Sequence, residues 1–176
     1  MEIRKLEREQ WKDYELKFSY STDGYYSFEV DNWDFQLVFH PYQTVLHKAF
    51  TDRLFAQWWE SPMVFGAFEG DDLMGVVECS PESWNHRFRI TNLLVFEKFR
   101  RQGVGKQLIH KAVEAGMDNH ARMIVLETQT CNRNAIEFYS KMGFQPIGFD
   151  LFCYINNDPD KTEVRLEMAM PLHDKE

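Results

Sequence analysis

Hydrophobic positions change their spacing several times along this chain, and the changes divide it into expected strands and helices. Ile90–Phe96 is rich in leucine and β-branched residues, which predicts a strand. Apolar residues then return at helical spacing over Gly103–Asn119, and Met123–Thr128 again predicts a strand. A strand, helix, strand order therefore forms the centre of the expected fold.

Turn signals place a hairpin before this centre. Met63–Phe68 and Leu73–Cys79 flank the turn Glu-Gly-Asp-Asp, a pattern that predicts two antiparallel strands. His86–Phe96 supplies the next antiparallel strand of the same sheet.

After the centre, apolar residues at i, i+3, i+4 and i+7 predict a second amphipathic helix over Ala135–Met142, which Gly143 ends. Gln145–Tyr154 and Val164–Met170 then predict a closing hairpin. The sequence as a whole predicts an α/β protein with a mixed sheet of about six to seven strands flanked by helices.

The first third of the chain has a weaker pattern. Ile3–Leu6 predicts a strand and Glu7–Phe18 a helix. Apolar and polar residues alternate over Trp33–Phe39, which predicts a strand that Pro41 ends. Thr44–Trp59 carries apolar residues at helical spacing, so a second helix is expected there.

The turn between the central strand and helix is basic and rich in glycine. Lys98–Lys111 holds five Lys/Arg and no Asp/Glu, although the chain carries a net charge of −8. The first turn of a helix normally prefers acids, because its free N–H groups make that end positive. Gly103 and Gly105 lack Cβ atoms, so the backbone N–H groups can approach an anion closely. The pattern predicts a site for a diphosphate.

Two common nucleotide-binding loops do not fit this spacing. A P-loop requires Ser or Thr after its lysine, but Gln107 follows Lys106 here. A dinucleotide fingerprint requires a third glycine, and Leu108 occupies that position.

These residues resemble the GNAT superfamily of acyl-CoA-dependent N-acetyltransferases. Its signature R-x-x-G-x-G/A follows a strand ending in L-x-V, here Leu93-Leu94-Val95 and then Arg100, Gly103 and Gly105. The second family pattern, N-x-x-A-x-x-x-Y-x-x-x-G-F, is complete over Asn132–Phe144. The streptothricin acetyltransferase branch is similar at Leu126–Gln129, Phe138-Tyr139 and Ser83–Asn85. The resemblance covers residues 60–155 well and residues 1–60 loosely.

The resemblance implies one GNAT domain over residues 1–176, in agreement with the length of 176 residues. Within it we expect a variable acceptor-side half at 1–60, an acetyl-CoA-binding core at 61–155 and a closing hairpin strand at 156–176.

The resemblance also implies the residues that bind acetyl-CoA. Backbone groups at the end of the signature strand would pair with the pantetheine arm, the basic loop would hold the pyrophosphate, and an asparagine would hydrogen-bond the pantetheine. The implied residues are Leu94, Val95, Arg100, Arg101, Gln102, Gly103, Val104, Gly105, Lys106 and Asn132.

The family pattern implies that Tyr139 protonates the departing sulfur. The general base is open, because Thr91 and Asn92 stand where the streptothricin branch has acids. Glu127 is the first candidate, since its spacing to Tyr139 matches the ribosomal-protein N-terminal acetyltransferases. Glu78 is the second candidate, and a water chain is the third.

Acceptor recognition is expected in the first half of the chain and near Trp84. Trp33 and Trp84, together with Glu78, are candidate substrate-binding residues, as part of an aromatic and acidic cleft for an ammonium group. The alternative is that most of the tryptophans, including Trp58, belong to the core.

Composition excludes several other partners. An acidic chain lacks the broad basic face that nucleic acid requires, and no 18-residue apolar run could span a membrane. Three scattered cysteines and a charged N-terminus indicate a cytoplasmic protein without disulfides. The histidines lack metal-ligand spacing, so no metal is expected. A homodimer is compatible with these features.

The leading hypothesis is a cytoplasmic N-acetyltransferase for a primary amine of a small molecule, such as a streptothricin-like antibiotic, a polyamine or an amino-sugar. Antibiotic resistance would follow from the first of these substrates. Two alternatives remain open, namely a peptide or protein N-terminal acetyltransferase and a non-catalytic acyl-CoA-binding sensor.

Overall fold

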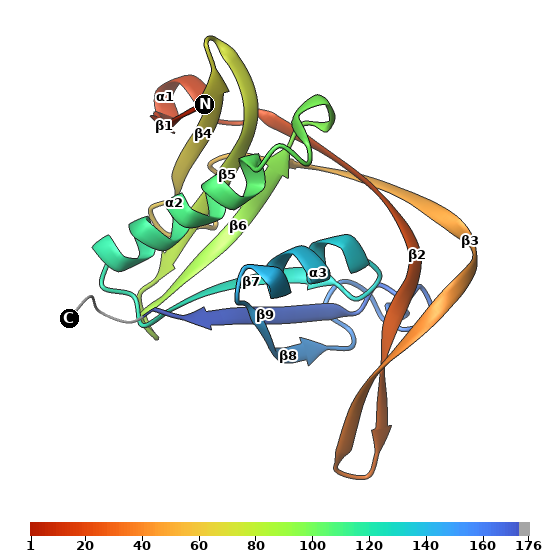
Figure 1. Cartoon of the computed structure of the whole chain (residues 1–176). Helices are drawn as coiled ribbons and strands as arrows, with labels where there is room; N and C mark the ends of the chain where they lie inside the picture. The colour runs from red at the N-terminus through yellow and green to blue at the C-terminus, as the bar shows by residue number, and fades with distance from the viewer. Residues whose placement is uncertain (173–176) are drawn as a thin grey trace. The chain divides into compact units, whose positions relative to one another are not determined.

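The computed structural model describes residues 1–172, and the end of the expected strand segment 156–176 lies outside that part. The elements in chain order, drawn in Figure 1, are β1 (Glu2–Leu6), α1 (Arg8–Trp11), β2 (Glu15–Asp31), β3 (Asp34–Arg53), β4 (Met63–Glu69), β5 (Asp72–Glu82), β6 (Arg87–Val95), the 3-10 turn η1 (Glu97–Phe99), α2 (Val104–Asp118), β7 (Met123–Gln129), α3 (Arg133–Lys141), β8 (Gln145–Asp150) and β9 (Arg165–Pro171).

Seven strands form one mixed sheet in the order β1-β4-β5-β6-β7-β9-β8. β6 and β7 are parallel, as a strand, helix, strand crossover requires, whereas the pairs along β1-β4-β5-β6 and the pair β8-β9 are antiparallel. The predicted α/β class and the strand number are confirmed. None of the described helices is both long and apolar enough to cross a membrane.

The chain divides into two compact units. The first contains residues 1–18, 51–126 and 170–172, and the second contains residues 19–50 and 127–169. The first unit therefore carries the basic loop, and the second carries Tyr139.

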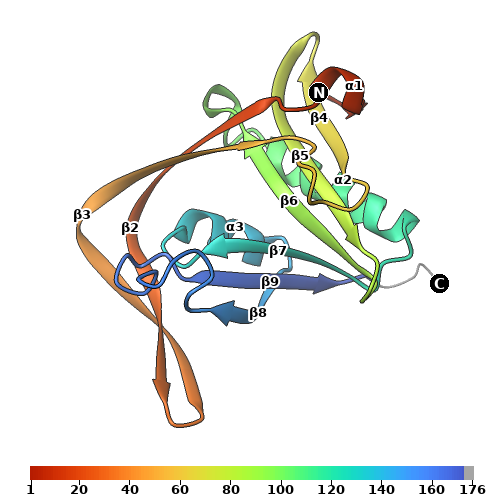
Figure 2. The ribbon, with the colours of Figure 1, turned by 180° about the vertical axis from the view of Figure 1, so that it is seen from behind.

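In the first unit, α2 packs on one face of β4, β5 and β6, an arrangement that Figures 1 and 2 both show. Its buried residues recur every three or four positions and include Val104, Leu108, Ile109 and Ala112. The predicted helix over Gly103–Asn119 is thus confirmed to within one residue at each end.

The opposite face of these strands is covered by the N-terminal segments of the same unit. Leu16, Leu54 and Phe55 pack there with Val76 and other apolar side chains. Fully burying a side chain of this size contributes about 1.5–3 kcal/mol. Residues 51–55 are therefore held tightly against β5.

The second unit contains most of a separate two-stranded ribbon made of β2 and β3. The Phe28 ring stacks on Phe149 with centroids 3.7 Å apart, and the Tyr26 N–H donates to the Thr130 carbonyl at 3.1 Å. These contacts fix the middle of the ribbon to the rest of its unit.

Two predicted helices are wrong. Within Glu7–Phe18 only Arg8–Trp11 is helical, and Glu15 already begins β2. Thr44–Trp59 is not helical either, because β3 runs to Arg53. Pairing along two long strands overrides a helical spacing of apolar residues, several of which stay exposed here.

The strand expected at Trp33–Phe39 is present but continues through Pro41. A two-stranded ribbon tolerates proline where the missing N–H would point outward.

Gly75 provides a test of this packing, because the backbone of β6 passes very close to it. A Cβ added at Gly75 would lie 2.5 Å from the Leu94 carbonyl oxygen and 3.1 Å from the Val95 Cα. We expect Gly75→Ala to destabilise the protein by about 1–3 kcal/mol, as overpacking typically does. Gly148→Ala is the control, since a Cβ there meets no atom within 4 Å. Denaturant unfolding measures both, and equal stabilities would contradict the expectation.

Candidate active site

The end of β6 extends beyond its pairing with β7. The parallel register runs from Arg87↔Met123 to Ile90↔Leu126. β6 then continues to Val95 while it stays paired with β5. A strand edge without a neighbour offers backbone N–H and C=O groups to an extended ligand. Leu94 and Val95, the expected partners of pantetheine, lie in this segment.

The basic loop, defined here as Arg100–Lys106, turns the chain from η1 into α2. Phe99 is buried and anchors the turn, and its N–H donates to the Phe96 carbonyl at 2.8 Å. Arg101 and Gly103 have φ values of 61° and 82°. Gly103 is the N-cap of α2, and a Cβ added there meets no atom within 4 Å. The space in front of the helix N-terminus can therefore accept a phosphate group.

The cations of the basic loop differ in their contacts. The Arg100 Nε donates to the Val95 carbonyl at 3.2 Å, and the Gln102 Nε2 donates to the Lys98 carbonyl at 3.0 Å. Within residues 1–172, neither the Arg101 nor the Lys106 side chain makes a hydrogen bond or ion pair. Two cations without partners at a helix N-terminus fit a diphosphate.

A β-bulge interrupts β6 at Thr91. Glu78 pairs with Asn92 and Cys79 pairs with Ile90, so Thr91 is the extra residue. Adjacent strand residues normally point to opposite faces, but here both Thr91 and Asn92 reach one carboxylate. The Thr91 hydroxyl and the Asn92 amide donate to the Glu78 Oε2 at 2.8 and 2.9 Å.

Glu78 is fully buried, and its other carboxylate oxygen also accepts a hydrogen bond. The Phe55 N–H donates to the Glu78 Oε1 at 2.6 Å. The sequence placed Glu78 on a strand facing Thr91 and Asn92, but it did not reveal this network. The signal that could have found it is the presence of one acid opposite two polar residues in an otherwise apolar strand pair.

Glu127, the first candidate for the base, is paired in the second unit. Its carboxylate lies 2.7 Å from the Arg165 guanidinium, which also contacts Glu167 at 2.5 Å. Burial alone would lower the pKa of Arg165, but hydrogen bonds to Cys153 and Glu167 raise it overall. The guanidinium is therefore charged and engages the Glu127 carboxylate in an ion pair.

Tyr139 lies in α3 with its ring between other aromatic rings. The Phe138 and Phe144 centroids are 5.4 and 5.9 Å from it. Burial raises the pKa of Tyr139 to about 12, so the phenol keeps its proton at neutral pH. Its hydroxyl makes no hydrogen bond to any residue among those described. Asn132, the N-cap of α3, accepts a hydrogen bond from the Ala135 N–H at 3.3 Å.

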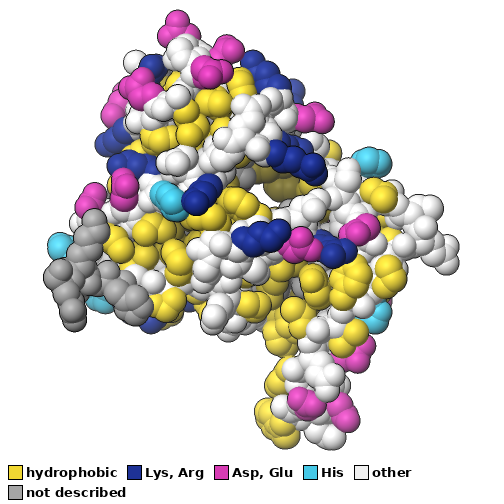
Figure 3. Space-filling view, in the orientation of Figure 1, with side chains coloured by type: hydrophobic (Ala, Val, Ile, Leu, Met, Phe, Trp, Pro, Cys, Tyr) yellow, Lys and Arg dark blue, Asp and Glu magenta, His cyan; other side chains and the backbone are white. Residues whose placement is uncertain are grey.

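The tryptophans expected near the acceptor are exposed. Trp33 is 91% exposed at the tip of the ribbon, and Trp58 and Trp84 are also largely exposed in the first unit. The alternative that most of these residues belong to the core is therefore wrong for all three. Hydrophobic and acidic side chains gather around the ribbon tip in Figure 3.

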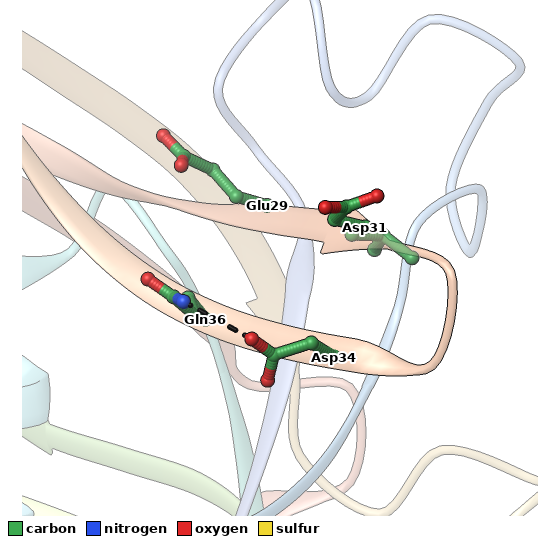
Figure 4. A pocket seen from close by; sticks show the side chains of 5 residues that line it. Glu29, Asp31, Asp34 and Gln36 are labelled. Atoms are coloured by element: carbon green, nitrogen blue, oxygen red, sulfur yellow. Dashed lines mark hydrogen bonds between the residues drawn. The ribbon is translucent and has the colours of Figure 1, made fainter.

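A shallow pocket lies on the ribbon near Trp33. Figure 4 shows Glu29, Asp31, Asp34 and Gln36 around it, and the Gln36 amide donates to Asp34 at 3.2 Å. The pocket is rich in negative charge, which attracts cations. Among residues 1–172, no group of three or more His, Cys, Asp or Glu side chains could hold a metal ion.

The sequence model of the acetyltransferase (GNAT) family matches residues 28–144, so the chain belongs to that family. N-alpha-acetyltransferase 30 of Xenopus laevis is 31% identical over 123 residues, which cover 68% of this chain and 44% of that protein. Streptothricin acetyltransferase of Escherichia coli is 36% identical over 111 residues, 63% of this chain and 61% of that protein. The crystal structure of nourseothricin acetyltransferase has a TM-score of 0.80 at 27% identity and covers 98% of both chains. The matches to both curated relatives thus span less than two thirds of their lengths.

Gly103 allows a direct test of anion binding. Gly103→Asp and Gly103→Asn introduce side chains of matched size that both tolerate left-handed backbone, but only Asp adds a negative charge. We expect Gly103→Asp to bind CoA at least about tenfold more weakly than Gly103→Asn, because a charged hydrogen bond contributes about 1.5–3 kcal/mol. Calorimetric titration with CoA measures the difference. Equal affinities would show that the phosphates bind elsewhere.

Proposed function

We propose that this protein is an acetyl-CoA-dependent N-acetyltransferase that acts on a primary amine of a small molecule. The basic loop carries the proposal, because two unpaired cations and an open glycine lie at the N-terminus of α2. The unpaired end of β6 supports it, since an extended pantetheine arm could pair there. Membership of the acetyltransferase (GNAT) family indicates that the transferred group is acetyl.

Cationic acceptors are favoured. The segment from Phe18 to His47, which forms most of the ribbon, contains four acids and no Lys or Arg. A streptothricin-like antibiotic or a polyamine is the proposed acceptor class, supported by the names of two of the relatives. Antibiotic resistance and a cytoplasmic location belong to this proposal, and three free cysteines support the location.

A peptide N-terminus is the second candidate acceptor. The similarity to N-alpha-acetyltransferase 30 favours it, as does the spacing between Glu127 and Tyr139. A non-catalytic acyl-CoA sensor would use the same CoA-binding residues. These residues are also compatible with a homodimeric enzyme.

Tyr139 is proposed as the acid for the departing thiolate. Its raised pKa and unengaged hydroxyl support this role. Glu127 and Glu78 remain the two candidates for the base. The ion pair between Glu127 and Arg165 favours Glu78, which has no such cation.

An amine panel tests the proposed function. Thiol release from acetyl-CoA is expected with streptothricin-type and polyamine acceptors, and more slowly with N-terminal peptides. The physical reason is attraction between polycations and an acidic protein, so added salt should raise KM for the cationic acceptors. A preference for peptides would support the second candidate, and CoA binding without any turnover would support the sensor.

Removal of the Tyr139 hydroxyl tests the acid. Tyr139→Phe keeps the ring and its aromatic contacts, so CoA affinity should change little. The loss of one general acid is expected to lower kcat by about 10² to 10⁴. In the wild type, kcat should not fall through loss of this proton until the pH nears about 12. Phe138→Leu, a change on the adjacent residue, is the control for altered packing, and an active Tyr139→Phe would assign the acid elsewhere.

A further inference from the structure

The Glu78 carboxylate has no cationic partner among the residues that the structure describes. The groups that contact its carboxylate come from the segment after β3 and from β6, and all are neutral donors. Within residues 1–172, Glu78 forms no ion pair. Buried carboxylates are normally paired with a cation or a metal, so this site lacks a positive partner.

The Thr91 hydroxyl is the accessible end of this network. Thr91 is partly exposed, whereas Glu78 and Asn92 are buried. Its hydroxyl donates to Glu78 and accepts no hydrogen bond from any residue that the structure describes. A hydroxyl has two acceptor lone pairs, so the oxygen can receive an N–H donor from outside the protein. Thr91 also lies in the part of β6 beyond its pairing with β7.

We infer that Thr91 and Glu78 form a proton relay for a cationic amine acceptor, with Thr91 touching the amine and Glu78 receiving the proton. This inference rests on the proposed function and names the acceptor class as a primary amine that arrives as its ammonium ion. The ammonium ion supplies the positive partner that Glu78 lacks.

The relay balances in protons. The ammonium N–H gives its proton to the Thr91 Oγ1 as the O–H proton of Thr91 moves to the Glu78 Oε2. The nitrogen then has the lone pair that forms the bond to the acetyl carbon, and the bond from that carbon to sulfur breaks. The acylated nitrogen loses its second proton and the departing thiolate gains one, so CoA leaves as its thiol. The protonated Glu78 returns its proton to solvent through Thr91 after the acetylated product leaves.

One other titratable residue lies next to Glu78. Cys79 follows it on β5, and burial together with the charge of Glu78 raises the pKa of that thiol. The cysteine therefore stays neutral. The facing residue on β4 is Val64, and the facing residue on β6 is Asn92, neither of which titrates.

Thr91→Val and Thr91→Ser test the accessible end of the relay. Valine keeps the size of threonine but removes the hydroxyl, whereas serine keeps the hydroxyl. We expect Thr91→Val to lower kcat/KM at neutral pH by about 10² or more, and Thr91→Ser to remain within about tenfold of the wild type. The deficit of Thr91→Val should shrink as the pH approaches the amine pKa, because the acceptor then arrives without its extra proton. CoA affinity, measured by calorimetry, should be unchanged.

A second pair of variants, which moves the carboxylate from residue 78 to residue 92, tests the buried end of the relay. Glu78→Gln should be slow at neutral pH, while Glu78→Gln/Asn92→Asp restores a carboxylate that can accept from Thr91 and from the new glutamine. We expect the double variant to be at least about tenfold faster than Glu78→Gln, since one general base contributes about 10² or more. Glu2→Gln, the same change at an exposed carboxylate of the first unit, is the matched control, with less than a tenfold loss at every pH.

Three results would overturn the relay. One is a Thr91→Val enzyme as active as Thr91→Ser, and another is a Thr91→Val deficit that is the same at every pH. The third is a double variant with restored melting temperature and CoA affinity that stays as slow as Glu78→Gln. If the wild type turns over no amine at all, the proposed function fails, a result distinct from these three.

Discussion

A buried carboxylate held by three neutral donors connects the main parts of the first unit. Glu78 joins the backbone of Phe55 to the bulge at Thr91, and hence ties the segment after β3 to the strand that ends at the basic loop. Phe55 has a φ of 60°, which a bulky side chain rarely adopts. Such a conformation persists only where its surroundings fix it, and the hydrogen bond to Glu78 together with burial of the ring does so.

The bulge also sets the register of the functional part of β6. One extra residue reverses which face each following side chain occupies. Leu94 therefore packs opposite Val76 in the core, and the close approach of Gly75 to this segment prevents a shift. The direction of the basic loop depends on this register, because Phe99 just before the loop and Val104 within it are both buried. Packing and a single charge thus position the loop that is proposed to bind diphosphate.

The sequence predicted the second half of the fold well and the first third poorly, for a physical reason. From Met63 onward, turn residues mark the element ends, and β4, β5, β6, α2 and β7 bury most of their apolar residues, so periodicity reports the structure there. In the ribbon, Val45, Leu46 and Phe50 are apolar but exposed, and their spacing imitates a helix. No local sequence rule distinguishes this strand from a helix, because its structure depends on the long-range pairing of β3 with β2.

The candidate site was predictable to the extent that it depends on backbone geometry. Gly103 lies at the N-terminus of α2 with a φ of 82°, which agrees with the expected need for a residue without Cβ. The partners of the carboxylates were not predictable, since the ion pair of Glu127 with Arg165 joins residues far apart in sequence. The bulge at Thr91 was equally hidden, because a single extra residue leaves no mark in a nine-residue strand.

The ribbon has a consequence for how copies of this protein meet in solution. Its two strands form their own sheet, and no third strand from the described part of the chain belongs to that sheet. Open edges of this length can pair with another chain. Asp31 and Asp34 beside the turn, with Glu29 next to them, give every copy the same negative charge at that tip. Mutual repulsion therefore opposes edge-to-edge stacking, and it weakens when salt screens these carboxylates.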